Sequence, residues 1–160
     1  MKNYRVPTLT IAGSDSSGGA GIQADLKTFS AIGTYGMSVI TAITAQNTEG
    51  VFDVEELSSE IIKSQIKAVC EDIPPKAIKI GMVSSPKIIK DIVESLEIYP
   101  CEYVVVDPVM ISKSGYSLLR PESKENLIKY LIPKAYIVTP NVPEAEEISS
   151  IKIETVEDMK

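Results

Sequence analysis

The sequence predicts an α/β protein with a mostly parallel sheet flanked by helices on both faces. Short runs rich in Val and Ile alternate with segments of helical periodicity along all 160 residues. These runs hardly alternate between apolar and polar residues, as expected for strands that are buried on both faces. Several helical segments follow Ser or open with Pro, which are common residues at helix starts.

Each predicted strand is a short run that contains β-branched residues, which fit the pleated surface of a sheet. In chain order the strands are Thr8–Ala12, Met37–Ala45, Ile78–Met82, Tyr103–Asp107 and Tyr136–Thr139, with Val51–Val54 as a short extra strand. Because helices separate most of them, we expect right-handed crossovers between parallel neighbours. Ligands of such sheets bind beyond the carboxyl ends of the strands.

The predicted helices are bounded by recognisable start and stop residues. They cover Ile22–Ile32, Glu60–Asp72, Pro86–Leu96, Pro121–Leu131 and Pro143–Ile148. Gly33 ends the first helix, and Ser58 with Ser59 caps the second. Ser85 is placed as the N-cap of the third helix, with Pro86 at its first position.

We expect a single domain over residues 1–160 that is incomplete at its C-terminal end. Thr155 to Asp158 match the capping-box pattern T-x-x-D, which marks the start of a helix. The chain then stops at Lys160, inside the first turn of that helix. A frayed acidic tail is the alternative interpretation of this segment.

Composition and charge exclude several classes of function. The net charge is −6 and the basic residues are scattered, which argues against a nucleic-acid partner. No apolar run is long enough to span a membrane, and the N-terminal residues do not resemble a signal peptide. The absence of His removes Ser–His and Cys–His nucleophiles and His metal sites. Cys70 and Cys101 lack metal or redox spacing, so we expect a cytoplasmic protein with reduced thiols.

The segment from Gly13 to Lys27 is the most informative part of the chain. It places four Gly within nine positions between a strand and a helix. Glycine lets backbone N–H groups approach a ligand, and a helix start presents N–H groups with a positive dipole end. The segment is therefore a candidate site for a phosphate or a small polar ligand.

Three interpretations compete for this segment. A P-loop is disfavoured, because Gly19 and Ala20 stand where Lys and Ser or Thr are needed. Gly19, Gly21 and Ala24 fit a dinucleotide fingerprint and hence an NAD-dependent oxidoreductase, but the acid expected roughly 20 residues further on is missing. The third interpretation is a tight turn without a ligand, although the Gly and Ser residues exceed what a turn needs.

Polar or soft residues stand at the ends of the later strands. Gln46 offers a donor and an acceptor that match an aminopyrimidine edge, or it is a solvated loop residue. Met82 covers a planar ring or fills a gap in the core. Asp107 suits a Mg²⁺ or phosphate network, or forms an Asx-turn before Pro. Asn141 and Glu144 are explained by helix capping as well as by function.

Five motifs in order resemble the hydroxymethylpyrimidine/phosphomethylpyrimidine kinases of thiamin biosynthesis, which belong to the ribokinase-like superfamily. The motifs are GSDSSGGAGIQADLKT at residues 13–28, TAQNT at 44–48, KIGM at 79–82, DPVM at 107–110 with KSG at 113–115, and TPNVPEA at 139–145. They extend over nearly the whole chain. Pyridoxal kinases of the same superfamily are similar, but the segment from Thr41 to Thr48 favours the pyrimidine enzyme.

The resemblance implies a role for each of these residues. Gly13 and Asp25 would line the pyrimidine pocket and meet its hydroxymethyl group. Gln46 would bind the aminopyrimidine edge and Met82 would pack on the ring. The Mg²⁺–phosphate network would contain Asp107, Asn141 and Glu144. The reaction would transfer the γ-phosphoryl group of ATP to the hydroxymethyl oxygen, and then a second phosphoryl group to the monophosphate.

The chain departs from the family pattern in its length. The resemblance implies a later Gly-Thr-Gly anion hole, the residue that activates the substrate hydroxyl and most of the adenine site, whereas the last Gly here is Gly115. We therefore expect no catalytic residue within this chain, and little kinase activity from it alone. A non-catalytic pyrimidine-binding module is the alternative. Part of the sheet would be uncovered, and a homodimer is compatible with the resemblance.

Overall fold

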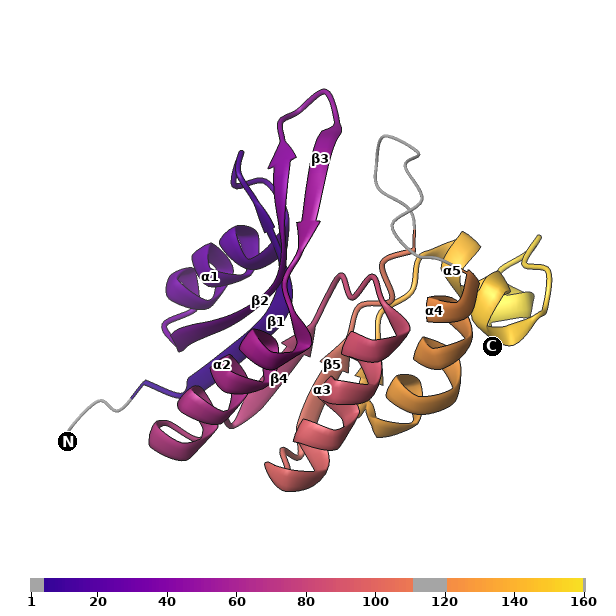
Figure 1. The fold of residues 1–160 in the computed structure, drawn as a ribbon. Coiled ribbons are helices and arrows are strands. Elements are labelled where there is room, and N and C mark those ends of the chain that lie inside the picture. The colour runs from indigo at the N-terminus through magenta and orange to yellow at the C-terminus, as the bar shows by residue number, and fades with distance from the viewer. Residues whose placement is uncertain (1–4, 111–120, 160) are drawn as a thin grey trace.

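The computed structural model describes residues 5–110 and 121–159. Within these ranges six strands form one sheet in the order β3-β2-β1-β4-β5-β6 (Figure 1). The strands are β1 (Pro7–Asp15), β2 (Tyr35–Gln46), β3 (Val51–Glu56), β4 (Ala77–Ile80), β5 (Tyr103–Val106) and β6 (Ile137–Val138). β3 is antiparallel to β2, and the other neighbouring pairs are parallel. The predicted mostly parallel sheet is confirmed.

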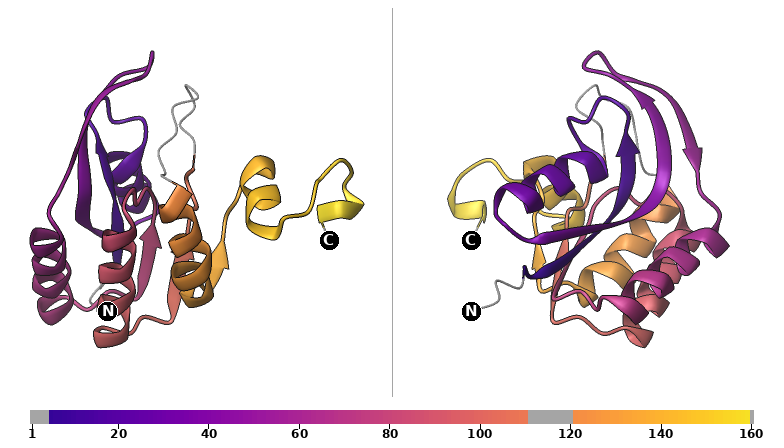
Figure 2. Two further views of the ribbon diagram at one scale, coloured as in Figure 1. Left: turned by 45° about the vertical axis from the view of Figure 1, so that its right-hand side comes forward. Right: turned by 90° about the vertical axis from the view of Figure 1, so that its left-hand side faces the viewer.

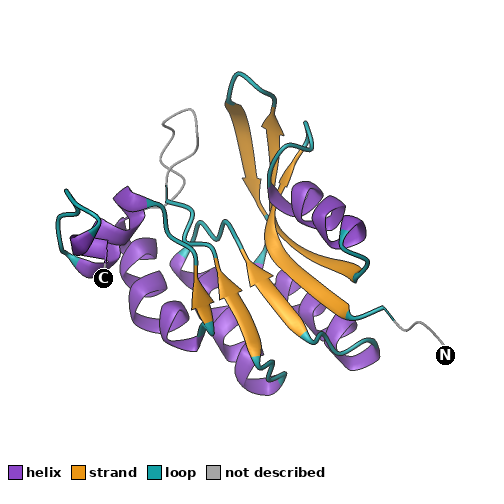
Figure 3. Cartoon of the chain, turned by 180° about the vertical axis from the view of Figure 1, so that it is seen from behind, coloured by secondary structure: helices purple, strands orange, loops and turns teal. Residues whose placement is uncertain are grey.

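Helices cover both faces of the sheet, as predicted. The α-helices of the described residues are α1 (Gly21–Ala31), α2 (Ser59–Asp72), α3 (Pro86–Ile98), α4 (Pro121–Asn126) and α5 (Val142–Ser149). α1 packs on β1 and β2, whereas α2, α3 and α4 lie side by side on the opposite face (Figure 3). In the described part of the chain, no helix combines the length and the hydropathy that a bilayer span requires.

The order of the strands places a switch point between β1 and β4. The chain moves from β1 through α1 to β2 in one direction, and later from β4 to β5 and β6 in the other. The crossover helices therefore lie on opposite faces on the two sides of this point. In open α/β sheets, ligands bind at such a point, beyond the carboxyl ends of the strands.

The main core lies between the sheet, the helices α2 and α3, and the helical turn Leu127–Leu131 that follows α4. On β1, β4 and β5, every second side chain points into it, and the strand registers align Leu9 with Ile78 and Val104. Full burial of each such side chain stabilises the fold by about 1.5 to 3 kcal/mol. The opposite face carries the alternate residues, and it is this face that becomes important for the candidate site.

The predicted helix ends agree well with the structure because their caps are formed. Ser58 accepts a hydrogen bond from Ile61 N, and Ser85 accepts one from Ile88 N. Gly33 has φ of +83°, in the left-handed region that follows many helices. Thr155 and Asp158 also interact as a capping pair, and Glu157–Met159 forms a short 3₁₀ turn.

Several predicted boundaries were wrong. β1 continues to Asp15, so Gly13 belongs to a strand, because pairing with β2 resumes beyond an irregularity after Ala12. β4 and β5 end before Met82 and Asp107, which lie in the following loops. The helix predicted over Pro121–Leu131 changes to a π-helical turn over Leu127–Leu131, followed by a 3₁₀ turn containing Pro133, which has no N–H to continue an α-helix.

Two parts of the sheet extend beyond its helical cover. The hairpin of β2 and β3 projects past the other strands (Figure 2). On the α1 side, β4, β5 and β6 are open in Figure 3. Tyr103, Tyr136 and Ile137 are exposed at the β5 and β6 end of the sheet, with the two tyrosine rings packed edge to face. Apolar and aromatic side chains are thus exposed at this edge of the sheet.

Candidate functional site

A row of side chains crosses the sheet on the face that α1 covers. The strand registers align Thr10 of β1 with Lys79 of β4 and with Val105 of β5. Side chains alternate between the two faces of a strand. Since Ile78 and Ile80 point into the core, Lys79 points to the other face, toward α1.

Lys79 lies between two of the predicted site residues. Its Nζ is 3.2 Å from Asp25 Oδ2, which also accepts a 2.6 Å hydrogen bond from the Thr10 hydroxyl. The same Nζ is 3.6 Å from Oδ2 of Asp107. A β-carbon on Gly81 would stand 2.9 Å from Lys79 Nζ, so the missing side chain leaves room for the ammonium group. One lysine therefore joins a carboxylate on α1 to a carboxylate beyond β5.

The surroundings of Asp107 disfavour its charged form. Burial raises the pKa of its carboxyl above the ordinary 3.8, the Lys79 ammonium opposes that rise, and the carboxylates of Glu144 and Asp25 add to it. The Asx-turn considered from the sequence is not the contact observed. Val109 N donates to the backbone carbonyl of Asp107, and the Asp107 side chain pairs with Lys79.

Asn141 and Glu144 form a capping box at the start of α5. Asn141 Oδ1 accepts from Glu144 N, and Glu144 Oε2 accepts from Asn141 N, both at 2.9 Å. Glu144 is buried, and its other oxygen accepts a 3.3 Å hydrogen bond from Met110 N. Glu144 thus ties α5 to the segment that follows Asp107. The capping interpretation is correct, and it leaves a functional role open.

The Gly-rich segment is closed by its own aspartate, which corrects the expectation of free N–H groups. Asp15 is 3% exposed. Its carboxylate accepts hydrogen bonds from the backbone N–H groups of Ser17, Gly19 and Ala20 at 2.8 to 2.9 Å. A carboxylate already occupies the start of α1, where a phosphate was considered. These N–H groups shape the loop rather than face a ligand.

Gln46 is connected to this loop and not directly to Lys79. The Thr44 hydroxyl donates to Ser14 O at 2.8 Å and lies 3.2 Å from the Gln46 side-chain oxygen. A hydroxyl has one hydrogen, so both contacts are satisfied when the Gln46 amide turns its NH₂ group toward Thr44. Ser14 Oγ in turn accepts from Gln23 of α1. Gln46 therefore stands at the β1–β2 side of the same strand ends.

Gly13 and Met82 face each other across the switch point. A β-carbon on Gly13 would lie 2.6 Å from Cε of Met82. The Met82 carbonyl is held by a 3.0 Å hydrogen bond from the Thr41 hydroxyl. A flat ligand near these strand ends would meet the bare backbone of Gly13 and the flexible thioether of Met82.

The structure thus brings the predicted residues to one end of the sheet in linked groups. Asp25 and Asp107 share Lys79, Gly13 touches Met82, and Asn141 pairs with Glu144. Sequence reasoning assigned no role to Lys79 or Thr10. The sequence did contain a sign of the role of Lys79. This lysine stands between two isoleucines of a buried strand, where a charged residue is rare unless it is paired.

The carboxylates at this end of the sheet are candidate ligands for an ion that arrives with phosphate. Among the described residues, no group of three or more metal-ligating side chains could hold a metal ion. Asp107, Glu144 and Asp25 carry three negative charges against one positive charge on Lys79. Mg²⁺ is commonly bound by one or two carboxylates together with substrate phosphates. Asp107 and Glu144 suit that arrangement.

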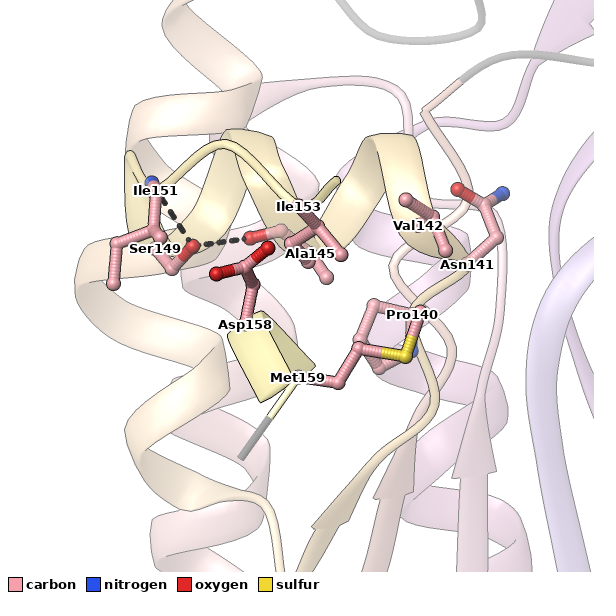
Figure 4. A pocket seen from close by; sticks show the side chains of 9 residues that line it. All are labelled: Pro140, Asn141, Val142, Ala145, Ser149, Ile151, Ile153, Asp158 and Met159. Carbon is pink, nitrogen blue, oxygen red and sulfur yellow. Dashed lines mark hydrogen bonds between the residues drawn. The ribbon is translucent and has the colours of Figure 1, made fainter. Parts of the chain in front are cut away.

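A separate hollow of about 340 Å³ lies between α5 and the C-terminal segment (Figure 4). Asn141 borders it, and its other walls include Val142, Ala145 and Ile151. None of Gly13, Asp25, Gln46, Met82, Asp107 and Glu144 lines it. Since it lacks the carboxylates and the lysine described above, we do not assign the chemistry to it.

Comparisons with known proteins agree with this architecture. The family model described as phosphomethylpyrimidine kinase matches residues 15–160. A hydroxymethylpyrimidine/phosphomethylpyrimidine kinase of Bacillus subtilis is 52% identical over 152 residues, which cover 95% of this chain and 56% of that protein. The chain spans about half the length of the curated relatives it matches.

Solved structures show the same fold, which is ribokinase-like. A crystal structure of phosphomethylpyrimidine kinase from Clostridium difficile 630 is 78% identical, with a TM-score of 0.93, and the match covers 98% of this chain and 68% of that one. A pyridoxal kinase from Staphylococcus aureus in complex with pyridoxal is 43% identical, with a TM-score of 0.87, covering 98% and 57%. The chain therefore belongs to the phosphomethylpyrimidine kinase family.

Proposed function

We propose that this chain carries the pyrimidine-binding part of a kinase of thiamin biosynthesis. The kinase transfers the γ-phosphoryl group of ATP to 4-amino-5-hydroxymethyl-2-methylpyrimidine and then phosphorylates the monophosphate. The observation that supports this most is the pair of carboxylates, Asp25 and Asp107, joined by Lys79 at the switch point of the sheet. The family of the chain supports the same substrate.

Binding of the pyrimidine is assigned to residues at the ends of β1, β2 and β4. Gly13 offers bare backbone to one side of the ring, and Met82 packs on the ring. The Gln46 amide binds the aminopyrimidine edge with one donor and one acceptor. Asp25 accepts a hydrogen bond from the hydroxymethyl group and thereby orients the oxygen that receives phosphate.

The phosphate end of the site is assigned to Asp107, Asn141 and Glu144. Mg²⁺, when bound with ATP, neutralises the charge of the transferred phosphoryl group. Asp107 and Glu144 would hold this ion, and Asn141 keeps Glu144 in place through the capping box. Phosphoryl transfer asks for positioning and charge neutralisation more than for covalent chemistry from the protein.

Pyridoxal is the second candidate substrate. The Staphylococcus aureus pyridoxal kinase, whose structure contains pyridoxal, is similar to 98% of this chain. Both compounds are flat nitrogen heterocycles with a hydroxymethyl group, so the same carboxylate could orient either. Gln46 favours the aminopyrimidine, because its amide complements a ring nitrogen next to an amino group.

We also propose that the protein acts in the cytoplasm. Cys70 and Cys101 are both free thiols. Reduced cysteines agree with the conditions of that compartment.

Calorimetric titration of the 160-residue chain with hydroxymethylpyrimidine and with pyridoxal tests the proposal. We expect saturable binding with one site per chain and a preference for the pyrimidine. A coupled ATPase assay on the same preparation should show little turnover, because we assign substrate binding and not the catalytic residue to this chain. Tighter binding of pyridoxal would favour the second candidate. Robust turnover would contradict our proposal that the catalytic residue is not among these 160 residues.

A further inference from the structure

We propose that Lys79 is a positioning residue that sets the orientation of Asp25 toward the hydroxymethyl group of the substrate. The proposal rests on the function proposed above and adds a residue to it. Lys79 does not need to touch the pyrimidine for this role. It acts through Asp25, the carboxylate that would accept the hydroxymethyl hydrogen bond.

The contacts of Asp25 support this assignment. Its Oδ2 receives both the Thr10 hydroxyl at 2.6 Å and the Lys79 ammonium at 3.2 Å. Both of these contacts are made by Oδ2, and among the described residues Oδ1 has no hydrogen-bond or ion-pair partner. Two donors from two adjacent strands therefore fix one oxygen and leave the other for a ligand. The rotation of the carboxylate is restricted before any substrate binds.

The second contact of Lys79 explains why a lysine stands here. Asp25 and Asp107 come from different elements, and the carboxylate of Glu144 adds a third negative charge near Asp107. Without a cation between them, Asp25 and Asp107 would repel each other and turn apart. Lys79 Nζ is close to both, and its side chain is 23% exposed, so the pair is only partly screened by water.

The local sequence makes room for this geometry. Lys79 sits in the middle of β4, and its side chain must reach forward along the strand to meet Asp107 beyond β5. Gly81 lies two residues ahead on the same face, and a β-carbon there would come 2.9 Å from Nζ and 3.1 Å from Cβ of Ala12. Lys79 thus provides the positive charge, and the absence of a side chain on Gly81 leaves the space for it.

A ligand pair separates positioning from mere stabilisation of the fold. Hydroxymethylpyrimidine and 4-amino-2,5-dimethylpyrimidine differ by the hydroxyl group that Asp25 would bind. Lys79→Met removes the ammonium and keeps a side chain of similar length. We expect it to weaken binding of hydroxymethylpyrimidine by a factor of about ten to a hundred, as for loss of a hydrogen bond to a charged group. Binding of the dimethyl compound should stay unchanged.

The controls use the same chain and the same titration. Lys134→Met removes an exposed ion pair with Glu97 far from the strand ends, and it should leave both affinities unchanged. Lys79→Gln serves as a second variant if Lys79→Met does not fold, and it should also lose the preference for the hydroxymethyl compound. Urea unfolding of each variant records any change in stability separately.

Each outcome decides the proposal. Equal weakening of both pyrimidines, or an unchanged preference, overturns the positioning role. If the unmodified chain binds neither pyrimidine, the proposed function fails. In that case the free energies of unfolding of Lys79→Met, Asp25→Asn and the double variant decide whether Lys79 holds Asp25. Non-additive changes support the contact, and strictly additive changes overturn it as well.

Discussion

The carboxylate of Asp15 accepts a 2.8 Å hydrogen bond from Ala20 N, immediately before α1 begins. The same side chain binds Ser17 through both its backbone N–H and its hydroxyl. An anion from the protein itself thus satisfies the donors that a Gly-rich segment usually offers to phosphate. The N–H groups of Ser17, Gly19 and Ala20 are therefore already bonded, and phosphate is expected nearer to Asp107.

Asp15→Asn should loosen this loop. The carboxylate accepts four hydrogen bonds, two from Ser17 and one each from Gly19 and Ala20. The amide of Asn has only one oxygen to accept them, and its NH₂ group would face the remaining donors. We expect a loss of about 1 to 3 kcal/mol in the free energy of unfolding, the usual cost of unpartnered buried donors. Urea unfolding and hydrogen exchange at Ser17, Gly19 and Ala20 measure it. Asp53→Asn, on the exposed β3, is the matched control and should leave both unchanged.

The contribution of Asp15 should depend on acid pH. Burial raises the pKa of this carboxyl, but hydrogen bonds from Ser17, Ala20 and Gly19 outweigh it, and the net pKa lies below the ordinary 3.8. A lowered pKa in the folded state contributes stability above the unfolded value, which is lost as pH falls through the folded value. The stability difference between the unmodified chain and Asp15→Asn should therefore shrink below about pH 4. A constant difference down to pH 2 would contradict this contact.

Asp107→Asn should raise the free energy of unfolding at neutral pH, whereas Asp15→Asn should lower it. The pKa of Asp107 is raised, so its protonated form stabilises the fold at acid pH, and that contribution is lost as pH rises through the folded value. At pH 7 the charge on this half-buried side chain is a cost that Asn removes. We expect a higher urea midpoint for Asp107→Asn at pH 7 and a smaller difference at pH 4. A lower midpoint at pH 7 would show that the Lys79 contact outweighs burial.

Asn141→Ala should weaken the start of α5. It removes the acceptor for Glu144 N, one half of the capping box. Loss of an N-cap side chain typically costs about 1 kcal/mol. Asn141→Ser retains a cap and should cost much less. The two variants are compared by urea unfolding, and equal losses would mean that the capping contact contributes nothing measurable.

Gly13→Ala should affect the ligand more than the fold. Its β-carbon would press on Cε of Met82, at a distance of 2.6 Å, and the flexible thioether would move into the space assigned to the ring. We expect weaker binding of hydroxymethylpyrimidine with a small change in unfolding. Met82→Ala in the same chain removes the clash. If Gly13→Ala binds the pyrimidine normally, Gly13 and Met82 do not border the ring.

Much of the fold could be predicted because the sequence marks it locally. Ser58, Ser85, Gly33 and the pair of Asn141 and Glu144 place helix ends by capping contacts that involve neighbours a few residues apart. The strand ends could not be predicted in the same way, because pairing with a distant strand decides them. β1 reaches Asp15 through its register with β2, which no local pattern reveals.

The candidate site was predicted in its residue types and not in its contacts. Asp25 was identified by resemblance and Asp107 also by its place at a strand end, but their shared partner depends on the register that places Lys79 beside Thr10. The role of Asp15 was missed for a related reason. A Gly-rich segment suggests free donors, and the sequence does not show that a side chain within the same loop already accepts from them.

The most direct test is whether residues from separate elements act on one ligand. Hydroxymethylpyrimidine is titrated into the unmodified chain, Asp25→Asn of α1 and Gln46→Ala of β2. We predict saturable binding to the unmodified chain, weakened by roughly tenfold or more in each variant, the cost of a buried group left unpaired. Saturable binding that neither substitution changes would contradict a common site at the strand ends.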